Sequence, residues 1–294
     1  MRELPPNSLV FQKRNGPITV GSVRLGTGTP FVIAGPCSVE SREHVIDAAR
    51  SVAAAGAKML RGGAFKPRTS PYDFQGLGAD ALRFLREASE ISGLPVVSEV
   101  MSAQQIELAA PFVDVFQIGA RNMQNFELLR EVGKTRHPVL LKRGMSATLS
   151  EFLNAAEYIL LEGNTNVILC ERGIRTFETY TRNTLDLSAV AALKQLTPLP
   201  VLVDPSHGTG RADLIRPLSR AAIACGADGL MIEVHDRAGE AKSDGAQAIT
   251  SFALAEIIAD LNKIYSALAM NVEQAGDTLA KPAEPVHAHV SHAR

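Results

Sequence analysis

The feature that most constrains the fold of this chain is a regular alternation between short apolar segments and longer segments with helical periodicity. Segments such as SREHVIDAARSVAAAGA, with Ser41 as the N-cap and Gly56 as the stop signal, and FELLREVGK predict helices. The apolar segments between them predict eight strands, at residues 31–35, 57–61, 95–99, 113–118, 138–143, 166–171, 200–204 and 228–234.

Most of these predicted strands are almost continuously apolar, which is typical of parallel strands covered by helices on both faces. Eight such units within residues 31–266 match the number and the usual size, roughly 250 residues, of a closed (β/α)8 TIM barrel. A doubly wound open sheet is the alternative, but no GxGxxG turn follows the first strand. We therefore predict an α/β protein with a barrel domain over residues 29–268.

Two segments lie outside the predicted barrel. Residues 1–28 contain VFQK and ITVGSVRL, split by Asn15 and Gly16, which predicts an N-terminal β-hairpin that could cover the closed end of the barrel. Residues 269–294 contain few large apolar residues and are rich in Ala, Pro and Glu, so we predict a disordered tail. We interpret the histidines of this tail as part of a flexible segment rather than a metal site: His287, His289 and His292.

Charge and cysteine content exclude several classes of function. A net charge of -1 gives no general attraction to nucleic acid or to an anionic membrane. There is no N-terminal signal-peptide pattern and no apolar run of roughly 18 residues, so we expect a cytoplasmic location. The three cysteines are too few and too widely spaced for a disulfide framework. Cys170 and Cys225 are interpreted as small buried apolar side chains.

Closure of the barrel places the ends of the predicted strands at 200–204, 228–234 and 31–35 in one sector, because the last strand pairs with the first. Four residues with metal-ligating side chains follow or end these strands: Cys37, His207, Glu233 and Asp244. One thiolate, one imidazole and two carboxylates in one sector predict a divalent-metal site.

The remaining sector of the barrel mouth is predicted to be cationic. Lysines and arginines end or follow the strands there, namely Arg61, Lys66, Arg68, Arg121, Lys142 and Arg172. Such cations repel one another unless an anion compensates, and their side chains suit phosphate and carboxylate groups. Gly119 and Ala120 add backbone N–H groups beside Arg121 and leave room for a phosphate. We therefore predict a substrate with more than one acidic group.

A family resemblance rests on eight motifs that occur in order along the chain: AGPCSVES, MLRGGAFKPRTSP, VSEVM, QIGARNMQN, LLKRGM, ILCERGIRTFE, VDPSHGTG and IEVH. Over roughly residues 28–262 the chain resembles 3-deoxy-D-arabino-heptulosonate 7-phosphate (DAHP) synthases. It is most similar to their bacterial and archaeal subfamily, which is related to 3-deoxy-D-manno-octulosonate 8-phosphate (KDO8P) synthase. The KPRTSP and IGAR segments favour the heptulosonate product.

The resemblance implies a metal-dependent condensation of phosphoenolpyruvate with erythrose 4-phosphate, the first step of the shikimate pathway to aromatic amino acids. It implies Cys37, His207, Glu233 and Asp244 as metal ligands, with Mn²⁺ favoured and Fe²⁺, Co²⁺ and Zn²⁺ as alternatives. It also implies a homo-oligomer, either a tetramer or a dimer. Because the sequence contains neither of the extra regulatory domains that some members of the subfamily carry, we expect no regulation by aromatic amino acids.

The substrate contacts implied by the resemblance divide into two groups. Those for phosphoenolpyruvate are Arg61, Lys66, Arg121, Lys142 and Arg172, and those for the sugar phosphate are Arg68 and Thr69. For catalysis we consider Lys66 as a proton donor, and His207 or Glu99 as a partner of the attacking water.

Three other functions stay open on the sequence alone. The first is KDO8P synthase, which uses arabinose 5-phosphate as the acceptor. The second is a Schiff-base aldolase with Lys142 as the amine nucleophile. The third is a phosphate-binding barrel without catalytic activity, which would need no metal ligands.

Overall fold

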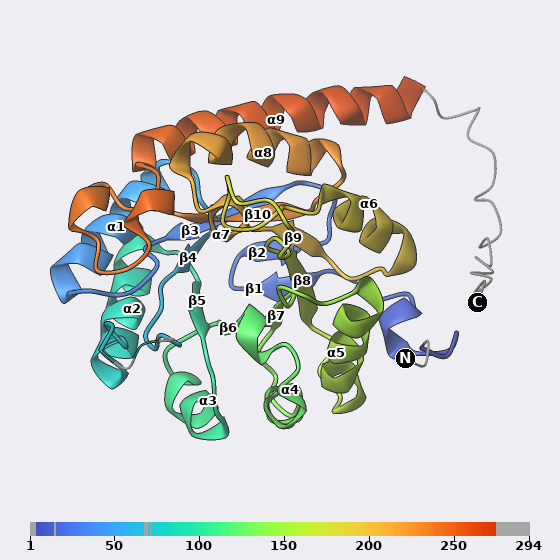
Figure 1. Ribbon diagram of the computed structural model, residues 1–294, viewed down its shortest axis with the longest axis horizontal. Helices are drawn as coiled ribbons and strands as arrows, with labels where there is room; N and C mark the ends of the chain where they lie inside the picture. Colours follow the sequence, from blue (N-terminus) through green and yellow to red (C-terminus); the bar gives the residue numbers. More distant parts are fainter. Residues whose placement is uncertain (1–3, 15, 68–69, 71, 275–294) are drawn as a thin grey trace.

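The main sheet is a closed ring of eight parallel strands. In the computed structural model, which describes residues 4–14, 16–67, 70 and 72–274, the ring has the order β10-β3-β4-β5-β6-β7-β8-β9 (Figure 1). The last strand pairs with the first from Gly229 opposite Phe31 to Glu233 opposite Gly35, so the predicted (β/α)8 barrel is confirmed. The ring strands are β3 (Phe31–Gly35), β4 (Met59–Arg61), β5 (Val96–Glu99), β6 (Val115–Ile118), β7 (Val139–Lys142), β8 (Val167–Glu171), β9 (Val201–Val203) and β10 (Gly229–Glu233).

Each of the eight predicted strand segments contains one of these strands, but only β3 has the predicted bounds. Pro95, Pro138 and Pro200 begin three of the predicted segments and lie just outside the strands. Proline has no N–H to donate to the ladder, so a strand that begins with it starts one residue later. The Pro95 carbonyl still accepts the Leu60 N–H at 2.9 Å.

The helices lie outside the ring (Figure 1). The predicted N-cap of α1 is confirmed, because the Ser41 side chain accepts the His44 N–H at 3.1 Å. Gly56, with φ of +100°, ends this helix in a conformation that favours glycine. No helix in the described part of the chain is long and apolar enough to cross a membrane. The helices are α1 (Arg42–Ala54), α2 (Ala79–Ser92), α3 (Ala103–Ala109), α4 (Phe126–Gly133), α5 (Leu149–Leu161), α6 (Leu187–Leu196), α7 (Pro205–Thr209), α8 (Ala212–Ala224) and α9 (Ser251–Gln274).

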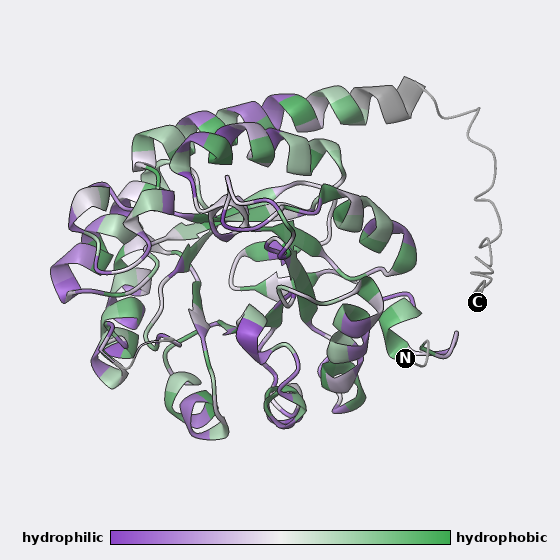
Figure 2. Cartoon of the chain, viewed as in Figure 1, coloured by the Kyte–Doolittle hydropathy of each residue, from purple (hydrophilic) through white to green (hydrophobic). Residues whose placement is uncertain are grey.

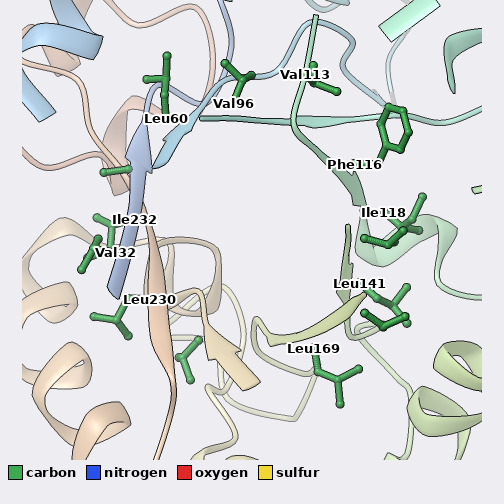
Figure 3. Close-up of a cluster of buried hydrophobic side chains, with 14 of the residues drawn as sticks. Val32, Leu60, Val96, Val113, Phe116, Ile118, Leu141, Leu169, Leu230 and Ile232 are labelled. Carbon is green, nitrogen blue, oxygen red and sulfur yellow. The ribbon is translucent and has the colours of Figure 1, made fainter. Parts of the chain in front are cut away.

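The larger hydrophobic core fills the space between the ring and the helices. Outward-facing strand side chains such as Leu60, Phe116 and Leu169 point away from the ring toward the helices (Figure 3). The strands are mostly hydrophobic, whereas the outer helices are mixed (Figure 2). This distribution explains why the strand segments are apolar without alternation, as predicted for parallel strands.

Inward-facing side chains form two layers inside the ring, because every second residue of a strand faces the same side. The lower layer is apolar and consists of Ile33, Met59, Val97, Val115, Leu140, Ile168, Leu202 and Met231. Two residues further along the strands the side chains are mostly polar: Arg61, Glu99, Gln117, Lys142, Cys170, Asp204 and Glu233. Cys170 is buried there, as predicted. This polar layer forms the floor of the carboxyl-terminal mouth of the barrel.

A two-stranded hairpin, β1 (Ile18–Val20) and β2 (Val23–Leu25), covers the opposite end of the ring. Its apolar side chains, including Ile18 and Leu25, pack against the lower layer. The hairpin lies across the ring of strands, so the predicted capping hairpin is confirmed (Figure 1). Its position within the N-terminal segment was wrongly predicted. The turn lies at Gly21, whose φ of +56° suits a tight hairpin, rather than at Gly16.

The predicted first strand of the hairpin, VFQK, is not a strand. Leu9–Phe11 forms a 3-10 helix, η1, whose start is fixed by the buried Glu157 carboxylate. This carboxylate accepts the N–H groups of Leu9 at 2.9 Å and of Val10 at 2.8 Å. A long-range contact with α5 therefore overrides the local pattern.

At the other end of the chain, α9 extends to Gln274, into the segment 269–294 for which disorder was predicted. The rest of that segment, with His287, His289 and His292, lies outside the described residues. Cys225 is the C-cap of α8 and is half-buried, so its predicted burial is only partial.

Candidate active site

The four predicted metal-ligating residues meet at the mouth of the barrel. Cys37 follows β3, His207 lies in α7 after β9, Glu233 ends β10, and Asp244 lies in the loop after β10. Each residue offers one ligand atom, and these atoms lie within 4.8 Å of one another. The Cys37 Sγ is 3.2 Å from Asp244 Oδ2, and His207 Nε2 is 3.2 Å from Glu233 Oε1. Pairing of β10 with β3 thus brings together residues that are up to 207 positions apart.

The chemistry of this group fits a divalent metal ion. It combines one sulfur, one imidazole and two carboxylates, a donor set that binds first-row transition metals. His207 Nδ1 is 2.8 Å from Asp204 Oδ2, which leaves Nε2 directed at Glu233. A histidine that ligates a metal usually donates its other ring N–H to such a carboxylate. The geometry of His207 is therefore that of a metal ligand oriented by a second residue.

Burial controls the protonation of the group. It raises the pKa of the Cys37 thiol to about 12, and the negative charge of Glu233 adds to this effect. Burial lowers the pKa of His207 in spite of the two nearby carboxylates, which favours the neutral imidazole that metals bind. Burial alone would raise the pKa of Glu233, but nearby cationic groups, including Arg61 and Lys66, lower it. Metal binding is therefore expected to release mainly the Cys37 proton.

A cavity lined by five cationic residues adjoins this group. They are Lys66, Arg121, Lys142, Arg172 and Arg182. His207 and Asp244 line the same cavity, so the cations and the candidate metal ligands share one space. Arg172 is buried, and burial lowers the pKa of its guanidinium. A concentration of five cations in one cavity suits an anionic ligand.

Two lysines connect the cavity to its surroundings. The Lys66 Nζ lies 2.9 Å from Cys37 Sγ and so joins the cationic cavity to the metal-ligating group. The Lys142 Nζ forms a buried ion pair with Asp204 Oδ2. Asp204 therefore contacts both Lys142 and His207, one residue from each sector.

Gly119 lets the Glu99 carboxylate approach the backbone closely on the side of the cavity formed by β5 and β6. A Cβ at this position would lie 2.1 Å from Glu99 Oε1, which is far inside van der Waals contact. Gln117 Nε2 donates to Glu99 Oε2 at 3.2 Å and orients the carboxylate. Gly119, Ala120 and Glu99 all line the cavity, as the sequence predicts for a phosphate-binding turn and a candidate catalytic carboxylate.

Among the described residues, one predicted substrate contact, Arg61, is not part of the lining of the cavity. Arg61 is buried below it, with Nη1 2.9 Å from Glu233 Oε1. Burial would lower the pKa of Arg61, but Glu233 and other nearby anionic groups raise it. Arg61 therefore contacts a candidate metal ligand in this structure. Arg68 and Thr69 lie outside the described residues.

Sequence reasoning missed three residues of the site. Asp204 ends the predicted strand at 200–204, so the strand-end signal used for the other residues could have identified it. Arg182 lies between β8 and α6, and Gln247 lies in the 3-10 helix η4 (Gly245–Gln247). Neither residue adjoins a strand end, and no pattern in the sequence marks them.

A second group of metal-ligating side chains consists of Glu40, His44 and His235. The rings of the two histidines are tilted by 33° to each other, with centroids 4.4 Å apart. His235 Nδ1 accepts the Arg237 N–H at 3.1 Å, so a neutral ring carries its proton on Nε2, the atom nearest to Glu40. A protonated nitrogen cannot ligate a metal, so this group is the weaker candidate for an ion.

The chain is similar in sequence to known aldolases. It is 50% identical over 275 residues to the phospho-2-dehydro-3-deoxyheptonate aldolase of Thermotoga maritima, an alignment that covers 92% of this chain and 81% of that protein. It is 32% identical over 251 residues to the 2-dehydro-3-deoxyphosphooctonate aldolase of Geobacter sulfurreducens, with coverage of 79% and 91%.

Solved structures agree with these sequence comparisons. The crystal structure of the Thermotoga maritima aldolase, also described as DAHP synthase, superposes with a TM-score of 0.86 and covers 90% of this chain and 78% of that one. A truncated form of the DAHP synthase from the same organism gives a TM-score of 0.82 at 47% identity, with coverage of 89% and 96%. The model of the DAHP synthetase I family matches residues 11–268. This chain therefore belongs to the DAHP synthetase I family.

Proposed function

We propose that this chain condenses phosphoenolpyruvate with D-erythrose 4-phosphate and water to give DAHP and inorganic phosphate, the first step of the shikimate pathway. The observation that carries the proposal is the joining of a metal-ligating group to a cationic cavity through Lys66, in a chain 50% identical to a phospho-2-dehydro-3-deoxyheptonate aldolase. The reaction needs both parts, because its substrates are acidic and its acceptor is an aldehyde.

The cationic cavity binds phosphoenolpyruvate in this proposal. The substrate has a carboxylate and a phosphate, and the lining offers the cations Lys66, Arg121, Lys142 and Arg172. Guanidinium groups hold such anions through two parallel hydrogen bonds, which fixes the orientation of the enol phosphate. Orientation and charge balance are the main contributions of these residues to the rate. The Arg61 ion pair with Glu233 makes its role indirect in the present geometry.

Cys37, His207, Glu233 and Asp244 hold the metal ion, and we propose Mn²⁺, with Fe²⁺, Co²⁺ or Zn²⁺ as alternatives. When bound, the ion supplies Lewis acidity for the aldehyde of the acceptor. Asp204 holds His207 in the required tautomer. Lys66 stabilises the Cys37 thiolate, since its ammonium lies 2.9 Å from the sulfur.

The reaction forms one carbon–carbon bond and breaks the C–O bond to the phosphate. Carbon 3 of phosphoenolpyruvate forms a bond to the aldehyde carbon, and Lys66 protonates the resulting alkoxide. Water adds at carbon 2 and loses its proton to Glu99, which lines the cavity. His207 has no free ring nitrogen for this role, because Nδ1 faces Asp204 and Nε2 is a candidate metal ligand atom. Phosphate then leaves with cleavage of the bond between carbon 2 and the bridging oxygen and takes up the proton of the new hydroxyl, which yields the ketone of the product and inorganic phosphate. With ¹⁸O-labelled water the label is expected in the sugar, and label in inorganic phosphate would contradict this order.

One enzyme assay tests two of the other functions, KDO8P synthase and a phosphate-binding barrel without catalytic activity. Similarity to 2-dehydro-3-deoxyphosphooctonate aldolases, at 32% identity, supports KDO8P synthase as a second candidate. We expect consumption of phosphoenolpyruvate with erythrose 4-phosphate, little with arabinose 5-phosphate, and none after chelator treatment. A preference for arabinose 5-phosphate would favour the second candidate, and no consumption with either would contradict both.

A Schiff-base mechanism through Lys142 is disfavoured by the buried ion pair, because Asp204 occupies the amine that would have to attack a carbonyl. Borohydride with both substrates should therefore leave the mass of the protein unchanged.

We also propose that the chain is cytoplasmic and forms a dimer or a tetramer. Light scattering of the purified protein measures its oligomeric state.

A further inference from the structure

A chain of hydrogen bonds runs from the loop after β8 to both carboxylates of the metal-ligating group. Arg182 Nη1 donates to Gln247 Oε1 at 3.0 Å and to Asp244 Oδ1 at 3.3 Å. Gln247 Nε2 donates to Glu233 Oε2 at 2.6 Å. One guanidinium thus reaches Asp244 directly and Glu233 through a single amide.

The chemistry of the partners fixes the orientation of the Gln247 amide. Arginine can only donate hydrogen bonds, and an ionised carboxylate can only accept them. The amide therefore presents its oxygen to Arg182 and its NH₂ group to Glu233. Glutamate at this position would repel Glu233, and a side chain without an amide could not bridge the two partners. Gln247 is buried, so water cannot replace it easily.

Both carboxylates depend on these contacts for their positions. Glu233 Oε2 is held by Gln247 while Oε1 is held by Arg61 at 2.9 Å. Asp244 has φ of +55° and is the one non-glycine residue with positive φ in the described part of the chain. This left-handed conformation is unfavourable for an L-residue and persists where surrounding contacts fix it. The ion pair with Arg182 is such a contact.

We propose that Arg182 and Gln247 are positioning residues that hold Asp244 and Glu233 in the geometry required for metal binding. This inference rests on the proposed metal centre. Since Arg182 also lines the substrate cavity, the pair links the loop after β8 to the metal ligands. Neither residue ligates the metal, so both act through the carboxylates that do.

The test is a calorimetric titration of the metal-free full chain with Mn²⁺ and, separately, Co²⁺. Gln247→Met removes both amide contacts at similar volume, and Gln247→Glu keeps an acceptor for Arg182 but removes the donor to Glu233. Arg182→Met removes the guanidinium. The Arg182 side chain is 39% exposed, so we expect this variant to fold. Loss of such outer contacts typically weakens metal binding 10- to 100-fold, and we expect roughly this loss for each variant.

Arg211→Met is the matched control. Arg211 lines a neighbouring pocket together with Arg182, but its side-chain hydrogen bonds go to Asp213, which is not a candidate ligand. Its metal affinity should equal that of the wild type. The double variant of Arg182 and Gln247 should lose less than the sum of the single losses, because the two residues form one chain of contacts.

The outcomes separate this inference from the proposed function. Wild-type affinity in both Gln247 variants and in Arg182→Met would overturn the positioning role and leave the metal centre intact. Failure of the wild type to bind either ion would overturn the metal centre itself, and the positioning role with it. Selective weakening in the variants with an unchanged circular dichroism spectrum would support the inference.

Discussion

Asp204→Asn is the substitution for which the structure gives the clearest expectation. Asp204 is fully buried and forms an ion pair with Lys142, whose side chain is only 5% exposed. Its other oxygen, Oδ1, accepts the His207 N–H at 2.9 Å, which asparagine can preserve. The Oδ2 atom, however, faces both the Lys142 ammonium and His207 Nδ1. An amide NH₂ in its place would face one ammonium and one ring N–H, so neither contact would survive.

The magnitude follows from burial. Removing one partner of a buried ion pair typically costs about 3–5 kcal/mol, because the other charge is left without compensation. No reduction for solvent screening is warranted here, since the two side chains are 5% and 0% exposed. The neighbouring cation Arg172, in the same cavity, adds repulsion to the unpaired Lys142. We therefore expect the free energy of unfolding to fall by about 3–5 kcal/mol.

Urea unfolding of the metal-free protein at pH 7 measures this loss. Glu131→Gln is the matched control, because it breaks the exposed Lys134 pair, and exposed pairs contribute only about 0–1 kcal/mol. Combining Asp204→Asn with Lys142→Met should recover much of the loss by removing the uncompensated charge. If Asp204→Asn were no more destabilising than Glu131→Gln, the reasoning about this buried pair would be refuted.

Three further expectations concern the site. Gly119→Ala should lower kcat/KM by about 100-fold with folding retained, because its Cβ would lie 2.1 Å from Glu99 Oε1 and displace that carboxylate; steady-state kinetics with wild-type values would contradict the tight contact. Cys37→Asn should lose tight metal binding, and full activity in the presence of chelator would show that the thiolate is not required. The pKa values of Asp204 and Glu233 are lowered in the folded chain, so their stabilising contribution should be complete above about pH 4–4.5 and lost as the pH falls below it. Unfolding midpoints measured from pH 7 to pH 3 test this direction. An increase in stability as the pH falls would contradict it.

The barrel itself was predictable from the sequence, because buried parallel strands require apolar side chains on both faces and so produce continuous apolar segments. The count of eight then predicts closure, and closure predicts that Cys37 and Glu233 lie near each other. The hairpin was placed less well. Asn15 and Gly16 form a strong local turn signal, but the contact of Glu157 with residues 9 and 10 decides the structure of that segment.

The role of Arg61 shows what strand-end reasoning cannot supply. Whether a strand-end side chain lines the cavity depends on its partner across the ring, since Lys142 of the same layer lines it and Arg61 does not. Arg61 lies in the inward-facing layer and meets Glu233, which is 172 positions away. The positions of Arg182 and Gln247 could not be predicted from the sequence for a related reason. The path of a long loop depends on tertiary contacts and not on periodicity.

The most direct test of the account is the position of a metal ion in a crystal of the Mn²⁺-loaded chain, located by anomalous diffraction at the manganese edge. We predict one peak at the barrel mouth within coordination distance of Cys37 Sγ, His207 Nε2 and the carboxylates of Glu233 and Asp244. A fully loaded crystal with no peak among these four side chains, or with its ion elsewhere in the barrel, would contradict the central claim.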